Sequence, residues 1–201
     1  MNATVPNPRF NAAFKAFDSA NAGDPNREVE DGVEYPRELR YAHRLTAQVL
    51  KLAPKASEAL LLASRCQHLR RWEIPRESYP ADRAGYLRWR RDLQQFHAQQ
   101  AGEILAAAGY DEAMRERVRE LNLKKNLGQD PELQVLEDAL CLVFLRFQLP
   151  ELARKTDDEK VINALRKSWG KMSEAGRAAA RALTLGPREK ELLERALAIP
   201  V

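Results

Sequence analysis

The sequence has few cysteines, few histidines and no long apolar run. Only two cysteines occur in 201 residues, and both lie inside apolar helical stretches, so we expect buried, reduced thiols rather than a disulfide framework. The longest apolar run is ALCLVFL at residues 139–145, far short of the roughly 20 residues that a membrane-spanning helix needs. The N-terminal stretch lacks a basic segment followed by an apolar one, which argues against a signal peptide. We therefore expect a cytoplasmic protein without a membrane partner.

The alternating pattern of β-strands and internal repeats are also missing, whereas helical periodicity covers most of the chain. Asp130 and Pro131 are typical of a helix start, and Gly109 is typical of the residue after a helix end. The predicted helices span about residues 8–20, 36–53, 57–71, 82–108, 111–125, 131–147 and 156–169, followed by two amphipathic helices separated near residues 185–187. This pattern predicts one all-α domain over residues 1–201, in which residues 150–201 support the rest.

Arginines are concentrated in one part of the chain, although the net charge is only +4, from 33 basic and 29 acidic residues. Eight fall in fewer than thirty residues: Arg65, Arg70, Arg71, Arg76, Arg83, Arg88, Arg90 and Arg91. A guanidinium group grips phosphates and carboxylates with two hydrogen bonds, and aromatic residues among the arginines can stack on nucleobases. The segment predicts binding of a nucleotide, another phosphorylated small molecule or an RNA end, although each arginine alone is more typical of a solvated helix face.

The three histidines and an acidic pair are expected to face the core from four helices. His43, His68 and His97 each fall on an apolar stripe, and Glu137 and Asp138 lie in the most apolar helix of the chain. A buried carboxylate needs a partner, and we expect Asp138 to face the pocket. Imidazoles and carboxylates that converge from facing helices can hold a divalent metal. The alternative, hydrogen-bonded core histidines, is about equally favoured.

Three segments carry a resemblance to a known family. RYAHRLTAQVLKLA, LLLASRCQHLRRW and LEDALCLVFL resemble the HD-domain superfamily of metal-dependent phosphohydrolases, whose pattern is an early histidine, a His-Asp pair and a later aspartate. The resemblance spans about residues 36–147 and implies an HD-like orthogonal helical bundle with a C-terminal helical extension. The blocks QHLRRWEIPR and RAGYLRWRR resemble more specifically an uncharacterised HD-like family.

One position departs from this pattern, because Gln67-His68 stands where the superfamily has His-Asp. Either the metal is lost, or the ligands of a divalent transition metal (Zn, Mn or Fe) are reorganised to His43, His68, His97 and Asp138. With a metal bound, the resemblance implies hydrolysis of a phosphate ester. Arg70 and Arg71 would then be catalytic clamps, with Glu73 as a proton shuttle. The candidate substrate-binding residues are Arg76, Arg83, Trp72, Tyr86 and Trp89.

Two other functions stay open. A degenerate HD-like module without catalytic activity could bind RNA or a nucleotide through its arginine- and tryptophan-rich surface, and the missing aspartate favours this alternative. An iron oxygenase is a third hypothesis, since related HD folds hold paired irons. It is weaker, because three histidines are few for two metal ions.

Overall fold

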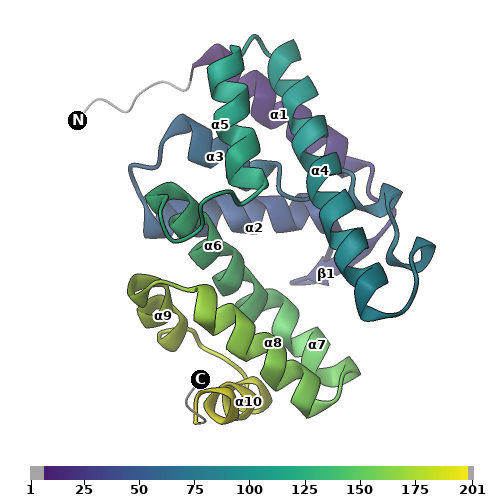
Figure 1. Cartoon of the computed structure of the whole chain (residues 1–201), viewed down its shortest axis with the longest axis vertical. Helices are drawn as coiled ribbons and strands as arrows, with labels where there is room; N and C mark the ends of the chain where they lie inside the picture. The colour runs from purple at the N-terminus through teal and green to yellow at the C-terminus, as the bar shows by residue number, and fades with distance from the viewer. Residues whose placement is uncertain (1–6, 199–201) are drawn as a thin grey trace.

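The computed structural model describes residues 7–198, which fold into an all-α bundle with one small two-stranded sheet (Figure 1). The predicted fold class is confirmed. The first six residues, part of the stretch in which no signal peptide is expected, lie outside the described residues, as do residues 199–201. No helix within residues 7–198 has both the length and the apolar composition of a membrane span.

The helices follow the predicted order. They are α1 (Pro8–Ala22), α2 (Arg37–Leu52), α3 (Glu58–Arg65), α4 (Arg83–Ala107), α5 (Glu112–Asn122), α6 (Pro131–Val143), α7 (Leu149–Lys155), α8 (Asp158–Lys171), α9 (Glu174–Arg181) and α10 (Pro187–Leu197). A π-helical segment, Phe144–Gln148, joins α6 to α7, so the helix predicted for residues 131–147 changes its winding near its end.

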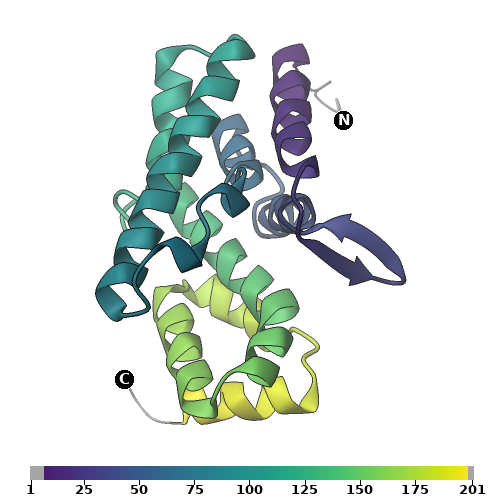
Figure 2. The same cartoon turned by 90° about the vertical axis from the view of Figure 1, so that its right-hand side faces the viewer.

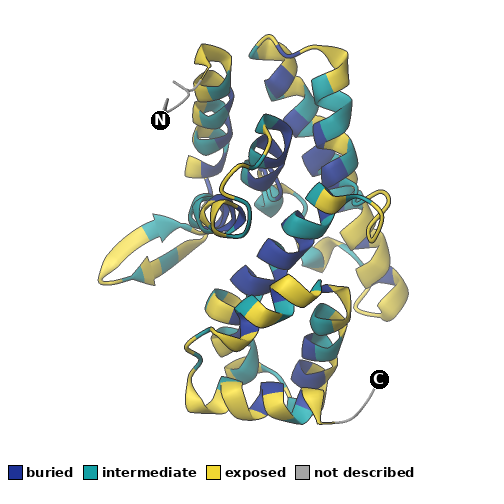
Figure 3. Cartoon of the chain, turned by 90° about the vertical axis from the view of Figure 1, so that its left-hand side faces the viewer, coloured by how far each residue is buried: buried dark blue, intermediate teal, exposed yellow. Residues whose placement is uncertain are grey.

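Helix α6 belongs to both apolar cores of the molecule. One core is built by side chains of α1 to α6, and the other by side chains of α6 to α10 (Figure 2). The start of α6 follows from local chemistry, because the Asp130 side chain accepts hydrogen bonds from the backbone N–H groups of Glu132 and Leu133, and Pro131 needs no hydrogen-bond acceptor. Eight of its thirteen residues are buried, and the buried ribbon runs through the middle of the molecule (Figure 3).

Four local features differ from the sequence-based predictions. Helix α7 was not predicted. A β-hairpin of β1 (Arg27–Glu30) and β2 (Val33–Pro36) was not predicted; Asp31 and Gly32 form its turn, both at positive φ. An Asp-Gly pair is a hairpin signal, but the charged strands hide the alternation. Helix α3 ends at Arg65 rather than Arg71. Helix α8 starts after Asp157, without a side-chain cap, rather than at the predicted residue 156.

Candidate functional site

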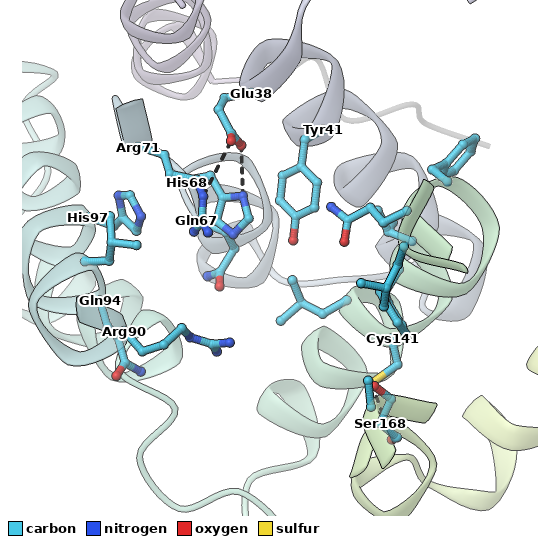
Figure 4. Close-up of a pocket in the computed structure, with 18 of the residues that line it drawn as sticks. Glu38, Tyr41, Gln67, His68, Arg71, Arg90, Gln94, His97, Cys141 and Ser168 are labelled. Atoms are coloured by element: carbon cyan, nitrogen blue, oxygen red, sulfur yellow. Dashed lines mark hydrogen bonds and ion pairs between the residues drawn. The ribbon is translucent and has the colours of Figure 1, made fainter. Parts of the chain in front are cut away.

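A cleft with a volume of about 1070 Å³ lies between the two cores. Helices α2 and α4 and the 66–82 connection line one side, and α6, α7 and α8 line the other (Figure 4). Its eight lysines and arginines outnumber its four glutamates, which makes it a cationic cleft. The lining cations are Arg37, Arg44, Arg71, Arg90, Arg91, Lys124, Lys155 and Lys171, and the glutamates are Glu28, Glu38, Glu137 and Glu151.

A Glu38–His68 dyad stands on the α2 side of the cleft. His68 Nδ1 lies 2.9 Å from Glu38 Oε2, and the phenol ring of Tyr41 stacks on the imidazole with the ring centroids 4.1 Å apart. An ionised carboxylate can only accept, so we assign the proton to Nδ1 and the lone pair to Nε2. Arg71 adds a second contact to the carboxylate, with its Nε 3.7 Å from Glu38 Oε1. The dyad thus holds the imidazole in one tautomer and one orientation.

The surroundings of the dyad favour an ionised Glu38 and a neutral His68. Burial alone would raise the pKa of Glu38, but the contacts with His68 and Arg71 outweigh it and hold the pKa below its ordinary value. Burial lowers the pKa of His68; Glu38 opposes this shift, and Arg71 and Arg90 add to it. A neutral imidazole with an oriented Nδ1–H has the form that a general base needs.

His97 is a second neutral imidazole beside the dyad. Its Nδ1–H donates to the Leu69 carbonyl oxygen at 2.8 Å, and its ring centroid lies 5.8 Å from that of His68. The buried Nε2 atom has no hydrogen-bond partner among residues 7–198. Burial, with His68 and Arg71 adding to it, lowers the pKa of His97 to about 3. His97 therefore stays neutral near pH 7 and is too weak a base to exchange protons there.

Gln67 is part of a buried amide network. Its Nε2 donates to the Ala63 carbonyl oxygen at 3.2 Å and to Asn122 Oδ1 at 2.5 Å. Gln94 Nε2 donates to the Asn122 carbonyl oxygen at 3.1 Å. The side-chain nitrogen of Gln67 is thus committed to protein acceptors, and this network ties the 66–82 connection to α5.

The four predicted metal ligands do not meet. His43 Nε2 lies 3.5 Å from Asp18 Oδ2 of α1, and Asp138 accepts hydrogen bonds from the Ser173 N–H at 2.8 Å and the Ser173 Oγ–H at 2.5 Å. His43 is five positions after Glu38, which turns it about 140° around α2, away from the dyad. Throughout the described range 7–198, no group of three or more His, Cys, Asp or Glu side chains could hold a metal ion. The predicted four-ligand set of His43, His68, His97 and Asp138 is corrected accordingly.

Glu137, rather than Asp138, lines the cleft, so the prediction that Asp138 faces the pocket is wrong. The Glu137 side chain is only 3% exposed and lies between two lysines, with Lys124 Nζ at 2.5 Å and Lys171 Nζ at 3.1 Å. Burial would raise the pKa of Glu137, but the lysines outweigh it and lower the pKa. Asp138 points instead to the start of α9, where Ser173 is the N-cap residue.

Several predicted site residues lie outside the cleft lining. Arg70, predicted to be catalytic, pairs with Glu73 at 2.5 Å and donates to Gln100 Oε1 at 3.1 Å. Glu73, the predicted proton shuttle, is thus held in an ion pair outside the cleft lining. Trp72 is half-buried and Arg83 is exposed, and neither lines the cleft. For Arg70 and Trp72 the reason is the early end of α3, after which helical periodicity no longer determines where side chains point.

Two other predicted substrate-binding residues stabilise the 66–82 connection instead. Arg76 donates to the carbonyl oxygens of Tyr79 at 2.9 Å and Pro80 at 2.7 Å. Trp89 is buried, and its Nε1–H donates to the Ile74 carbonyl oxygen at 2.9 Å. Arg76 therefore stabilises the fold of the connection itself, and Trp89 ties the connection to α4.

Four of the predicted site residues do line the cleft: His68, His97, Arg71 and Tyr86. Sequence reasoning missed Glu38 and Tyr41, and counted Arg90 only as a member of the cluster. Glu38 and Tyr41 are three positions apart on α2, the spacing of neighbours on one helix face. That spacing was the available signal, but the stripe of α2 that contains His43 is the one expected from the sequence to face the core.

The comparisons with known proteins give one match. The model of the family DUF4202, described as a domain of unknown function, matches residues 11–193. No curated protein and no solved structure matches the chain. Because the match covers most of the sequence, the chain belongs to the DUF4202 family.

Proposed function

We propose that the protein binds a phosphorylated small molecule, such as a nucleotide, in the cationic cleft and hydrolyses its phosphate ester with the Glu38–His68 dyad. The observation that carries this proposal is the dyad itself: an imidazole fixed by a carboxylate at 2.9 Å, in a cleft with excess positive charge. The resemblance to the HD-domain superfamily supports the same substrate class. The predicted metal ligands are apart, so no step is assigned to a metal ion.

The positive charge available to a ligand is concentrated near the dyad. Seven of the eight lining cations have a carboxylate within 4.0 Å. Arg90 alone has none among residues 7–198; its guanidinium instead donates to the Tyr86 hydroxyl at 3.2 Å. In Figure 4, the Arg90 side chain extends into the cleft below Gln67 and His68. A phosphate group at Arg90 would regain the charge partner that this arginine lacks.

The chemistry follows from the protonation states. Neutral His68 takes a proton from water at Nε2 while the water oxygen forms a bond to phosphorus. The bond between phosphorus and the ester oxygen breaks, its electron pair stays on the leaving oxygen, and His68 returns the proton to that oxygen. Arg90 and Arg71 offset the negative charge of the transferred phosphoryl group. Glu38 stabilises the protonated imidazole that exists between the two transfers.

The test makes the same substitution, histidine to glutamine, at His68 and at His43 and compares the two variants. In a phosphatase screen on nucleotides and an aryl phosphate, His68→Gln should lower kcat at least about 100-fold, because general base catalysis contributes roughly that much. His43→Gln should retain activity, because His43 lies on another face of α2 beside Asp18. Full activity of His68→Gln would contradict the hydrolase, as would a strict requirement for an added metal ion in wild-type protein.

A second candidate is a binding module without catalysis. The observation in its favour is Gln67, whose amide stands where the HD pattern has a metal-binding histidine. In that case wild-type protein binds phosphate esters, and the Arg90→Gln variant binds them weakly, but neither shows turnover.

The proposal includes a cytoplasmic location, where the free thiols of Cys66 and Cys141 stay reduced. RNA enters it only as a phosphorylated end small enough for the cleft.

A further inference from the structure

The cleft has a continuous apolar part opposite the dyad. The side formed by α2, the 66–82 connection and α4 carries the groups of the proposed phosphate site, among them His68, Arg71 and Arg90. Figure 4 shows Arg90 and His97 on this side and Cys141 and Ser168 across from them. The side formed by α6 to α8 carries polar and apolar lining residues in equal number, and its partly exposed apolar residues are Leu140, Phe144, Phe147, Leu152 and Ala164.

The apolar residues that line the cleft from α6 to α7 form one continuous stripe. Leu140, Phe144 and Phe147 follow the spacing of one helix face across α6 and the π-helical segment, and Leu152 extends it into α7. Phe147 is partly covered by Arg44, whose guanidinium carbon lies 4.1 Å from the ring centroid. Leu140, Phe144 and Leu152 are partly exposed, and among the described residues no arginine or lysine lies over the Phe144 ring. A ligand without apolar groups would leave this part of the wall in contact with water.

Two large side chains at the start of α4 add to the apolar surface of the cleft. Tyr86 is 42% exposed and Leu87 is 56% exposed, and both line the cleft. They precede Arg90 by four and three positions, so they share its side of α4. A phosphate group at Arg90 therefore has apolar surface beside it as well as across from it.

The volume of the cleft also fits an organic ligand that is larger than inorganic phosphate. Pockets for organic ligands measure roughly 300–1,000 Å³ and are lined mostly by apolar side chains with a few polar groups. This cleft, at about 1070 Å³, lies at the top of that range. An inorganic phosphate would occupy only the part of the cleft beside Arg71 and Arg90.

We propose that the ligand is a phosphate monoester whose ester group is large and apolar. Its phosphate lies at Arg90 and Arg71, and its apolar part packs against Leu140, Phe144 and Leu152 and covers Leu87. This inference rests on the proposed phosphate site and deepens it, since it separates apolar phosphate esters from small polar ones such as phosphorylated sugars or glycerol.

Phosphonates test the inference, because their carbon–phosphorus bond is not hydrolysed by the proposed reaction. The affinities of wild-type protein for octylphosphonate, 1-naphthylphosphonate, methylphosphonate and 2-aminoethylphosphonate would be measured by calorimetry below any micelle-forming concentration. We expect the first two to bind at least tenfold more tightly than the last two. Equal affinities across the series would overturn the inference.

Leu87→Ser is the variant of choice, because the exposed side chain contributes little to folding. We expect it to weaken octylphosphonate binding at least threefold and to leave methylphosphonate binding unchanged. The matched control is Leu50→Ser, since Leu50 is 43% exposed but does not line the cleft; it should change neither affinity. An equal loss in both variants would overturn the placement of the apolar group.

The outcomes also separate this inference from the proposed function. If all four phosphonates bind equally and Arg90→Gln abolishes their binding, the phosphate site stands and the apolar ester group is overturned. If wild-type protein binds none of them, inorganic phosphate or a nucleotide, both proposals are overturned.

Discussion

The three histidines differ in what their ring nitrogens contact. His68 donates to a carboxylate and His97 to a backbone carbonyl, whereas His43 lies beside Asp18 near the surface. Only His68 combines an oriented tautomer with contact to the cleft and an ionised partner. The residue type and the helical stripe were visible in the sequence, but the partner of each ring depends on chain segments 25 or more positions away.

The buried His97 predicts acid sensitivity. The unfolded chain takes up a proton near the ordinary histidine pKa of about 6.5, whereas folded His97 does so only near pH 3. The unfolded state therefore binds more protons between these values, and the free energy of unfolding falls as the pH drops from about 6.5 towards 3. Urea denaturation should show wild-type protein losing about 2 kcal/mol more than His97→Gln between pH 7 and pH 4.5. Equal losses would contradict the buried, neutral state of His97.

Arg70 offers a second test at the residue scale. Its φ of 50° is in the left-handed region, which costs a non-glycine residue about 1–2 kcal/mol. Arg70→Gly removes that cost but adds freedom to the unfolded chain and deletes the half-exposed pair with Glu73. The free energy of unfolding should change by less than about 1 kcal/mol, and the affinity for a phosphate ester by less than twofold. A tenfold loss of affinity would restore Arg70 to the site.

Among the helices and strands, features signalled by neighbouring residues were predicted and those set by distant residues were not. Asp130 with Pro131, Asp111 and Gly109 mark helix ends through hydrogen bonds or backbone angles within a few positions, and these ends agree with the structure. The early end of α3 and the buried face of α2 depend on packing against other helices. Glu38 could not be distinguished from a solvated glutamate, because its side-chain partners His68 and Arg71 lie 30 or more positions away.

Helix α9 depends on the residue that was predicted to bind metal. Asp138 accepts from Ser173, and a Cβ atom at Gly176 would lie only 2.5 Å from the Asp138 carboxylate. Gly176→Ala should therefore displace the carboxylate and lower the free energy of unfolding by about 1–3 kcal/mol, the cost of unsatisfied buried hydrogen bonds. The matched control is Gly170→Ala in α8, where a Cβ would meet nothing within 4 Å. Thermal denaturation should show the control unchanged or more stable, and equal behaviour of the two variants would contradict the cap.

In the molecule as a whole, the cleft exists because two apolar cores share one helix. Helix α6 contributes Leu136 to the first core and Leu142 to the second, so its cleft-facing side chains lie between them. Glu137 lies on that helix face and pairs with Lys124 and Lys171, and Arg90 lines the same cleft from α4. Local sequence signals placed most of the helices but not the junction, since the junction depends on which faces of α2, α4 and α6 pack together.

The most direct test of the account is the affinity of the cleft for a phosphate ester when Arg90 is replaced. Arg90 is the lining cation without a carboxylate partner among residues 7–198, and Arg88, exposed on the same helix, does not line the cleft. Calorimetry should show that Arg90→Gln weakens binding at least tenfold, about 1.4 kcal/mol, whereas Arg88→Gln changes it less than twofold. Equal affinities of wild-type protein and Arg90→Gln would contradict the central claim that this cleft is a phosphate-binding site.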